Sequence, residues 1–260
     1  MEPAVLRDDM VDSLEHEAKR CVRSEAVSVA MRTVPREAFV DEEYAYADRS
    51  SERHGTRVLA PNTAARLLEA LDLEPGGNVL VVGAGVGYTA AVCAEIVGAT
   101  NVQAVDISRR VTYEARSNLE RAGYGGVLVD RRDGAGGLPE YAPYDRILLE
   151  AAAIEPPRRL VGQLADGGRL VLPLGGGEQT LAAVEDEPGG DGSEGGDRGR
   201  GYAVAERYGT VAFAPMLLEG EQAETVERNR THREDREFAR RDAERRRGWE
   251  QEWIDWEGRL

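Results

Sequence analysis

Short apolar runs alternate with helix-like stretches through the middle of this chain, and this alternation limits the possible folds more than any other feature. It predicts strands at 79–82, 102–105, 127–129, 146–149 and 169–174 and helices at 88–97, 108–122 and 157–164. Parallel strands need a crossover connection, usually a helix, so the alternation predicts an α/β fold with a mostly parallel sheet and helices on both faces. Three further apolar runs follow without helices between them, at 181–184, 202–205 and 210–213. They predict an antiparallel edge.

The N-terminal part of the chain shows a helical pattern of its own. Apolar residues recur at helical spacing over 4–33, where Ser24 is a potential cap for a second helix, and Pro35 ends the pattern. Residues 36–61 show no sustained period and predict an ordered loop, before a helix over 62–73. We therefore expect an N-terminal helical cap with its loop over 1–61, a core domain over 62–218 and an extension over 219–260.

Two segments have a composition that sets them apart. Residues 185–201 consist mostly of glycine and acidic residues, which cannot bury a core, and predict a flexible insert. Residues 219–258 are rich in Arg and Glu and predict a charged helix that carries Trp249, Trp253 and Trp256. These tryptophans are candidates for anchoring the helix to the body or to a second copy in a homo-oligomer, and the alternative is a solvated helix with no assigned role.

Charge and composition exclude several classes of protein. The 260 residues carry a formal net charge of −15, which argues against a protein built to grip nucleic acid. Lys19 is the single lysine, and such an acidic, arginine-based composition is typical of proteins from salt-loving archaea. Two Cys and three His have no metal-ligand spacing, so we expect no metal. No apolar run is long enough to span a membrane and no leader opens the chain, so we expect a cytoplasmic protein without membrane contacts.

A glycine-rich turn joins the strand at 79–82 to the helix at 88–97, with the pattern Gly83-Ala84-Gly85-Val86-Gly87. Glycines let the backbone pass close to a ligand, and the helix N-terminus that follows favours an anionic or polar group. Dinucleotides and S-adenosylmethionine both use such a turn. A dinucleotide fingerprint needs a small sixth residue where this chain has Tyr88, which favours S-adenosylmethionine.

Two acidic residues at the ends of the following strands fit the same nucleoside. Asp106 ends the next strand, where a carboxylate can accept both ribose hydroxyls, although it could instead cap the helix that follows. Asp133-Gly134 follows the third strand, where a carboxylate can reach the adenine amino group, although a plain turn would look the same.

Taken together, these stretches resemble the protein-L-isoaspartate O-methyltransferase family over about residues 8–218. The Val34-Pro35-Arg36 stretch that continues to Phe39-Val40 is specific to that family. Other matching stretches are Ser24-Glu25, Tyr46-Ala47-Asp48, Gly83 to Ala91, Asp133-Gly134, Ala142 to Asp145, Ala151 to Ala153, Gly167 to Gly175 and Phe213-Ala214-Pro215.

The resemblance implies a fold, a cofactor and a reaction. It implies a Rossmann-like S-adenosylmethionine-dependent methyltransferase fold over 62–218, with the substrate side in the 1–61 segment. The expected activity is methylation of the free carboxylate of isoaspartyl residues in damaged proteins, a repair step. Such a carboxylate is ionised at neutral pH and needs no general base. The expected donor-binding residues are Gly83, Ala84, Gly85, Gly87, Tyr88, Asp106, Ile107, Asp133 and Gly134.

The chain departs from the family's pattern near the acceptor. Leu59 stands where the family has its active-site Ser and Arg57 where it has Thr, while His54 is retained. An inward-pointing Arg57 would supply a positive charge to the acceptor carboxylate, so Arg57 and His54 are candidate catalytic residues. The acidic residue common two positions before the first glycine is Val81 here, and the Gly before Ala151 has become Glu150.

These departures leave three hypotheses for function. The first is an isoaspartyl methyltransferase. The second is a relative that keeps the donor but has changed its acceptor or lost repair activity, which Leu59 favours. The third is a dinucleotide-dependent oxidoreductase, which depends on the glycine turn alone.

Overall fold

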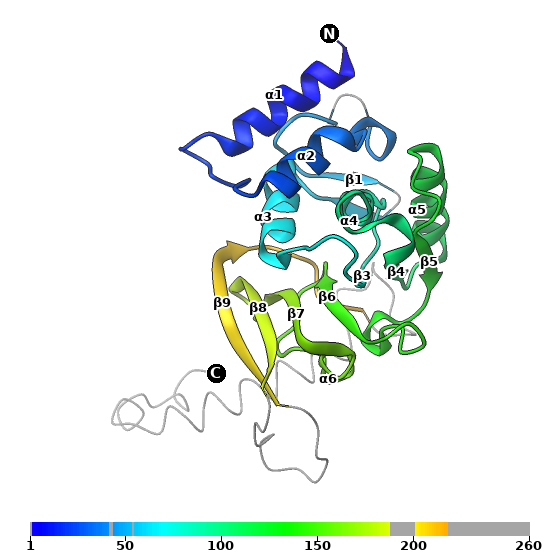
Figure 1. Ribbon diagram of the computed structural model, residues 1–260, viewed down its shortest axis with the longest axis vertical. Coiled ribbons are helices and arrows are strands. Elements are labelled where there is room, and N and C mark those ends of the chain that lie inside the picture. The colour runs from blue at the N-terminus through cyan, green and yellow to red at the C-terminus, as the bar shows by residue number, and fades with distance from the viewer. Residues whose placement is uncertain (1, 42–43, 54, 188–200, 218–260) are drawn as a thin grey trace, which may run out of the picture. The chain divides into compact units, whose positions relative to one another are not determined.

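A seven-stranded sheet forms the centre of the protein in a computed structural model that describes residues 2–41, 44–53, 55–187 and 201–217. The strand order is β5-β4-β3-β6-β7-β8-β9 (Figure 1). The parallel strands are β3 (Val79–Val82), β4 (Val102–Asp106), β5 (Leu128–Arg131), β6 (Tyr144–Leu149) and β7 (Leu164–Leu174). The antiparallel strands are β8 (Gln179–Glu187) and β9 (Gly201–Val211). The predicted mostly parallel sheet with an antiparallel edge is confirmed.

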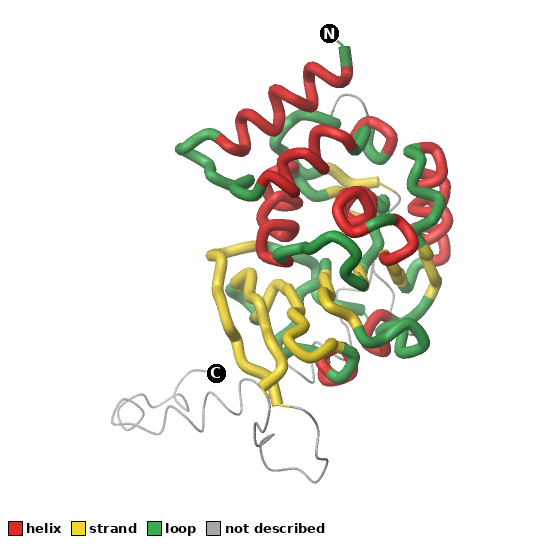
Figure 2. The backbone as a smooth tube through the Cα atoms, in the orientation of Figure 1, coloured by secondary structure: helices red, strands yellow, loops and turns green. Residues whose placement is uncertain are grey.

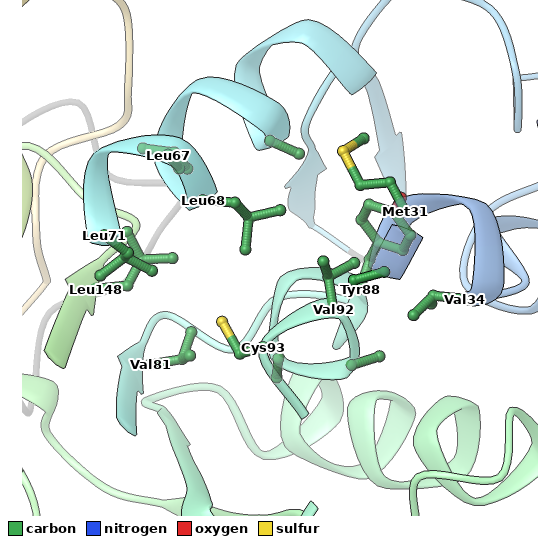
Figure 3. Close-up of a cluster of buried hydrophobic side chains, with 14 of the residues drawn as sticks. Met31, Val34, Leu67, Leu68, Leu71, Val81, Tyr88, Val92, Cys93 and Leu148 are labelled. Carbon is green, nitrogen blue, oxygen red and sulfur yellow. The ribbon is translucent and has the colours of Figure 1, made fainter. Parts of the chain in front are cut away.

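Successive side chains of the central strands point to opposite faces of the sheet, and each face has its own core. Val79 and Val81 belong to one cluster and Leu80 and Val82 to the other. The first cluster, drawn in Figure 3, is covered by α1 (Pro3–Glu15), α2 (Glu25–Thr33), α3 (Pro61–Leu71), α4 (Tyr88–Val97) and α5 (Arg109–Arg121). The second face is covered by α6 (Arg158–Val161), which Figure 1 shows across the sheet from α3 and α4. A strand buried on both faces reads as a continuous apolar run, which is why β3 is conspicuous in the sequence.

The second face differs in detail from the prediction. The helix predicted over 157–164 is only the four residues of α6, because Pro157 begins it and Gly162 ends it. β7 starts at Leu164 rather than at 169 and passes through the expected turn, since Leu164 already pairs with Tyr144 across a bulge.

The N-terminal segment forms two helices as predicted. Ser24 caps α2, where its hydroxyl accepts a hydrogen bond from the Val27 N–H at 3.3 Å. The prediction of a loop without strands over 36–61 is wrong, because β1 (Ser51–Arg53) and β2 (Thr56–Val58) form a small antiparallel hairpin there (Figure 2). Strands of three residues are too short to leave a period in the sequence.

The C-terminal strands are longer and fewer than predicted. One strand, β9, contains the run at 202–205 and the first two residues of the run at 210–213, and Glu206, Arg207 and Gly209 interrupt its apolar pattern. The last register pair of β8 and β9 is Glu187 with Gly201, so residues 188–200 connect two antiparallel strands. The insert predicted over 185–201 is shorter than expected, because residues 185–187 belong to β8 and Gly201 begins β9. Residues 188–200 and 218–260 lie outside the described residues, so the flexibility of the insert and the tryptophan-bearing extension stay predictions. All described residues belong to one compact unit, Met1–Gly220, and none of their helices is long and apolar enough to cross a membrane.

Candidate donor-binding site

The glycine turn is fastened to the neighbouring strand and open on its outer side. The N–H groups of Gly83 and Ala84 both donate to the Val105 carbonyl, at 2.8 and 2.9 Å. Gly83, Gly85 and Gly87 have φ values of 91°, 53° and 92°, which residues with a Cβ rarely adopt. Gly83 and Gly85 are partly exposed, whereas Ala84 is buried beneath them. The turn is thus a preformed surface of backbone at the carboxyl end of β3, as a nucleotide site requires.

Asp106 lies beside this turn at the end of β4. Its Oδ2 accepts a hydrogen bond from the Gly85 N–H at 3.2 Å and its Oδ1 accepts one from the Ser108 N–H at 2.9 Å. Burial raises the pKa of Asp106, and these two N–H groups oppose the shift. Asp106 is not the capping residue of α5, because the Ser108 hydroxyl caps that helix. Each Asp106 oxygen keeps a free lone pair, so the carboxylate can still accept two hydroxyls.

Asp133-Gly134 brings a third group to the same edge of the sheet. The Asp133 carboxylate accepts a hydrogen bond from the Ala135 N–H at 2.9 Å, as in the plain-turn alternative. A Cβ on Gly134 would lie 2.4 Å from Cγ1 of Val82, so only glycine lets this turn approach β3. The turn therefore lies against the same strand end that begins the glycine turn.

Ile107 and Tyr88 differ in what they offer the site. Ile107 is partly buried directly after Asp106. The Tyr88 ring instead packs in the core, edge-on to Phe39 with ring centroids 5.7 Å apart and under the Arg36 guanidinium at 4.5 Å. Because the Tyr88 side chain is buried in the core, the predicted contact of Tyr88 with the donor stays a prediction for its backbone alone.

Buried Arg36 orders the loop that follows α2. Its Nε donates to the Ala45 carbonyl at 2.8 Å and its Nη2 to the Leu59 carbonyl at 2.6 Å. Burial lowers the pKa of Arg36, and the Tyr88 ring and these carbonyls stabilise its charge. The family-specific Val-Pro-Arg stretch thus positions the backbone of Leu59.

The predicted acceptor-side residues are not brought together in the described part of the chain. The Leu59 side chain packs against the first core cluster. Arg57 is exposed, and its guanidinium donates to the Ala212 carbonyl at 2.9 Å and the Ser50 hydroxyl at 3.3 Å. His54 lies outside the described residues. The inward-pointing Arg57 that the sequence suggested is not what the structure has, because these two acceptors hold its guanidinium at the surface.

Two functional candidates at this site were missed by sequence reasoning. The Thr56 hydroxyl lies 3.8 Å from the position that a Cβ on Gly85 would occupy, so it lies beside the turn. The Glu150 carboxylate follows β6 and accepts a hydrogen bond from the Thr89 hydroxyl on α4. Burial raises the pKa of Glu150 to about 8, with a smaller contribution from Asp106. The sequence marked Glu150 only as a departure from the family's pattern, although an acidic residue directly after a buried strand was the available clue.

Comparison with known proteins decides the family. A model of the family described as protein-L-isoaspartate(D-aspartate) O-methyltransferase matches residues 7–194. The chain belongs to this family. Among curated members, the protein-L-isoaspartate O-methyltransferase of Aeropyrum pernix is 47% identical over 176 residues, which cover 65% of this chain and 68% of that protein. The one from Methanocella arvoryzae is 41% identical over 192 residues, covering 72% and 96%.

Solved structures of the family share the fold. A structure described provisionally as a protein-L-isoaspartate O-methyltransferase from Plasmodium falciparum, in complex with S-adenosyl-L-homocysteine, has a TM-score of 0.67 at 20% identity and covers 81% of this chain and 98% of its own. A second protein-L-isoaspartate O-methyltransferase has a TM-score of 0.63 at 27% identity and covers 80% and 65%. Membership of this family confirms the resemblance read from the sequence, and it leaves the dinucleotide-dependent oxidoreductase without support.

Proposed function

We propose that this protein transfers a methyl group from S-adenosylmethionine to the free carboxylate of isoaspartyl residues in damaged proteins. One observation carries the proposal: the family's match covers both the Arg36 loop and the glycine turn, and in the structure Arg36 holds that loop while the Thr56 hydroxyl lies beside the turn, 3.8 Å from the position of a Cβ on Gly85. The nearness of the family-specific loop to the glycine turn supports one site for donor and acceptor.

The residues at this edge fit the donor. The Asp106 carboxylate can accept the ribose hydroxyls, the Gly83–Gly87 turn offers backbone without side chains, and Gly134 leaves room at the adenine end. When bound there, S-adenosylmethionine supplies an activated methyl group. Its predicted contacts are those expected from the sequence, with the side chain of Tyr88 removed from the set.

The reaction asks little of the acceptor side beyond alignment. An isoaspartyl carboxylate is ionised at neutral pH, so no residue has to remove a proton. The protein must hold that carboxylate in line with the methyl group and exclude water. Thr56 is the hydroxyl placed to orient it, since position 59 is a leucine that packs against the core.

A second candidate function follows from that leucine. An apolar side chain at position 59 cannot hydrogen-bond a carboxylate, which favours an enzyme that keeps the donor and uses another acceptor. Replacing Leu59 by Ser separates the two. Activity on isoaspartyl peptide that appears only in Leu59→Ser supports the changed acceptor, whereas activity already present in the unaltered protein supports repair.

Calorimetry and a product assay test the main proposal. In concentrated KCl, the protein should bind S-adenosylmethionine and S-adenosylhomocysteine but not NAD. It should then release methanol, after base treatment, from a peptide with one isoaspartyl residue and not from the same peptide with aspartate. Donor binding without turnover on that peptide would reject the acceptor, and an absence of donor binding would reject the whole proposal.

The finer setting of this function is also proposed. We place the enzyme in the cytoplasm of a cell with high internal salt, from its charge and its single lysine. Its partners are proteins or peptides with isoaspartyl residues, and neither nucleic acid nor a membrane is among them. The 219–260 extension is the candidate contact for a homo-oligomer.

A further inference from the structure

Glu150 is a carboxylate at the candidate donor site that neither the sequence nor the family's pattern assigned to a function. Its Cβ lies 3.4 Å from the position a Cβ on Gly83 would take, so it borders the first glycine of the turn. The Thr89 hydroxyl fixes Oε1, and the Glu150 N–H donates to the Val82 carbonyl at 2.8 Å. The side chain is thereby held at the junction of β3, β6 and α4.

The second oxygen of this carboxylate has no protein partner in the described part of the chain. No described lysine or arginine pairs with Glu150 or with its neighbour Asp106. Two acidic groups are thus held at one strand-end edge without a cation between them. Keeping a largely buried carboxylate ionised there is costly unless a positive group pairs with it.

The order of the strands indicates which positive group that is. Along the edge of the sheet, Asp133 follows β5, Asp106 ends β4, the glycine turn follows β3 and Glu150 follows β6. The donor has its parts in a matching sequence: adenine, ribose, sulfonium and, at the far end, an amino acid with an ammonium group. If Asp133 and Asp106 take the adenine and ribose, the amino-acid end reaches the β6 side.

We propose that the Glu150 carboxylate pairs with the ammonium group of the donor's amino-acid part, with Thr89 as the residue that orients it. This inference rests on the proposed function, because it takes S-adenosylmethionine as the ligand. Glu150 is thereby a donor-specificity residue: it favours ligands with a free amino group over the same nucleoside without one.

Calorimetry with three ligands tests this in the full-length protein. S-adenosylmethionine has both the sulfonium and the ammonium, S-adenosylhomocysteine has only the ammonium, and 5′-methylthioadenosine has neither. Glu150→Gln keeps the shape of the side chain and removes its charge. We expect this variant to bind the two amino-acid-bearing ligands about tenfold or more weakly, since a charge-assisted hydrogen bond is lost, and to bind 5′-methylthioadenosine unchanged. Glu74→Gln, an exposed glutamate before β3, is the matched control and should bind all three like the unaltered protein.

Each other result overturns the inference. Equal affinity of Glu150→Gln and the unaltered protein for all three ligands removes Glu150 from the site. Weaker binding of S-adenosylmethionine alone assigns Glu150 to the sulfonium instead of the ammonium. Weaker binding of 5′-methylthioadenosine as well shows a damaged site rather than a lost charge. An unaltered protein that binds none of the three rejects the proposed function itself, which is a separate outcome.

Discussion

At the scale of single residues, Leu59 and Thr56 differ in where the structure places their side chains. Position 59 carries an aliphatic side chain that packs into the core, while the Thr56 hydroxyl lies beside Gly85. The hairpin that carries Thr56 ends just before Leu59, so the two positions flank the same short stretch of chain. The hydroxyl that lies beside the glycine turn is therefore three residues before position 59.

Thr56→Val should lower turnover without changing donor affinity. Valine keeps the shape and removes a hydrogen bond to a charged acceptor, so kcat/KM for an isoaspartyl peptide should fall about tenfold. Steady-state kinetics together with calorimetry of S-adenosylmethionine measure the two effects. Thr100→Val, at an exposed threonine far along the chain, is the control. Unchanged kinetics of Thr56→Val would mean that Thr56 does not touch the acceptor.

Glu150 makes the stability of the ligand-free protein depend on pH. The folded-state pKa of about 8 lies above the ordinary 4.5, so between those values the unfolded chain releases a proton that the folded protein keeps. Stability is therefore lost as pH rises from about 5 to about 8, and Glu150→Gln does not suffer this loss. Asp106 and Cys93 are the other titratable groups that interact with Glu150.

Urea unfolding of both proteins without ligand measures this effect. The free energy of unfolding of Glu150→Gln should exceed that of the unaltered protein by a growing margin, up to a few kcal/mol, between about pH 5 and about pH 8.5. A margin that stays constant over this range would show that Glu150 is ionised in the folded protein throughout.

At the scale of elements, the turn after β5 is held against β3 by one glycine. A Cβ on Gly134 would meet Val82 at 2.4 Å, whereas one on Gly136, two residues on, would meet nothing within 4 Å. The contact is with the side chain of a buried strand residue, which has no room to retreat. The turn can therefore approach the donor site only with glycine at this position.

Gly134→Ala should lower the stability of the protein and its affinity for S-adenosylmethionine. Gly136→Ala should change neither. Overpacking of this kind typically costs about 1–3 kcal/mol, because Val82 or the turn has to shift. Thermal unfolding with and without S-adenosylmethionine compares the pair. Equal melting temperatures for the two variants would mean that the turn does not need its close approach to β3.

The sequence predicts those elements whose burial leaves a long or regular pattern. The strand β3 is apolar at all four positions because both of its faces are covered, and Ser24 is a cap with a clear sequence pattern. The strands β1 and β2 have three residues each, which is too few for a recognisable alternation. The length of β9 is not evident from the sequence because Gly209 interrupts its apolar pattern. Short or interrupted elements are set by tertiary pairing, which a single sequence does not display.

The part of the candidate site that follows successive predicted strands could be predicted from the sequence. Gly83, Asp106 and Asp133 each follow their own predicted strand, so their meeting at one edge follows from a parallel sheet. Val81 and Glu150 look like two unrelated departures in the sequence. The sheet puts their strands side by side, with Val82 opposite Leu149, and so places a carboxylate next to the turn from the neighbouring strand.

At the scale of the whole molecule, the net charge of −15 over 260 residues makes the stability of the fold depend on salt. Like charges repel within a Debye length of about 10 Å at 0.1 M salt, and this length shrinks as salt is added. The folded state gains from that screening more than the expanded unfolded chain, because its charges are closer together.

The melting temperature should accordingly rise by several degrees from about 0.1 M to about 2 M KCl. Differential scanning calorimetry measures it, and KCl is preferred to sulfate because sulfate also strengthens apolar burial. The same series in sucrose of equal osmolality is the control for water exclusion. A melting temperature that is flat or falls with KCl would contradict an adaptation to salt.

The arginine contacts to β9 and to the residue that follows it have a consequence for the order in which parts of the candidate site are completed during synthesis. Arg57 reaches the Ala212 carbonyl, and Arg66 reaches the carbonyls of Tyr208 and Thr210 at 2.8 and 3.1 Å. The segment from Gly83 to Gly134 leaves the ribosome more than seventy residues before these partners do. In a nascent chain the glycine turn and the turns after β4 and β5 are therefore synthesised before the β9 region that anchors the hairpin of β1 and β2.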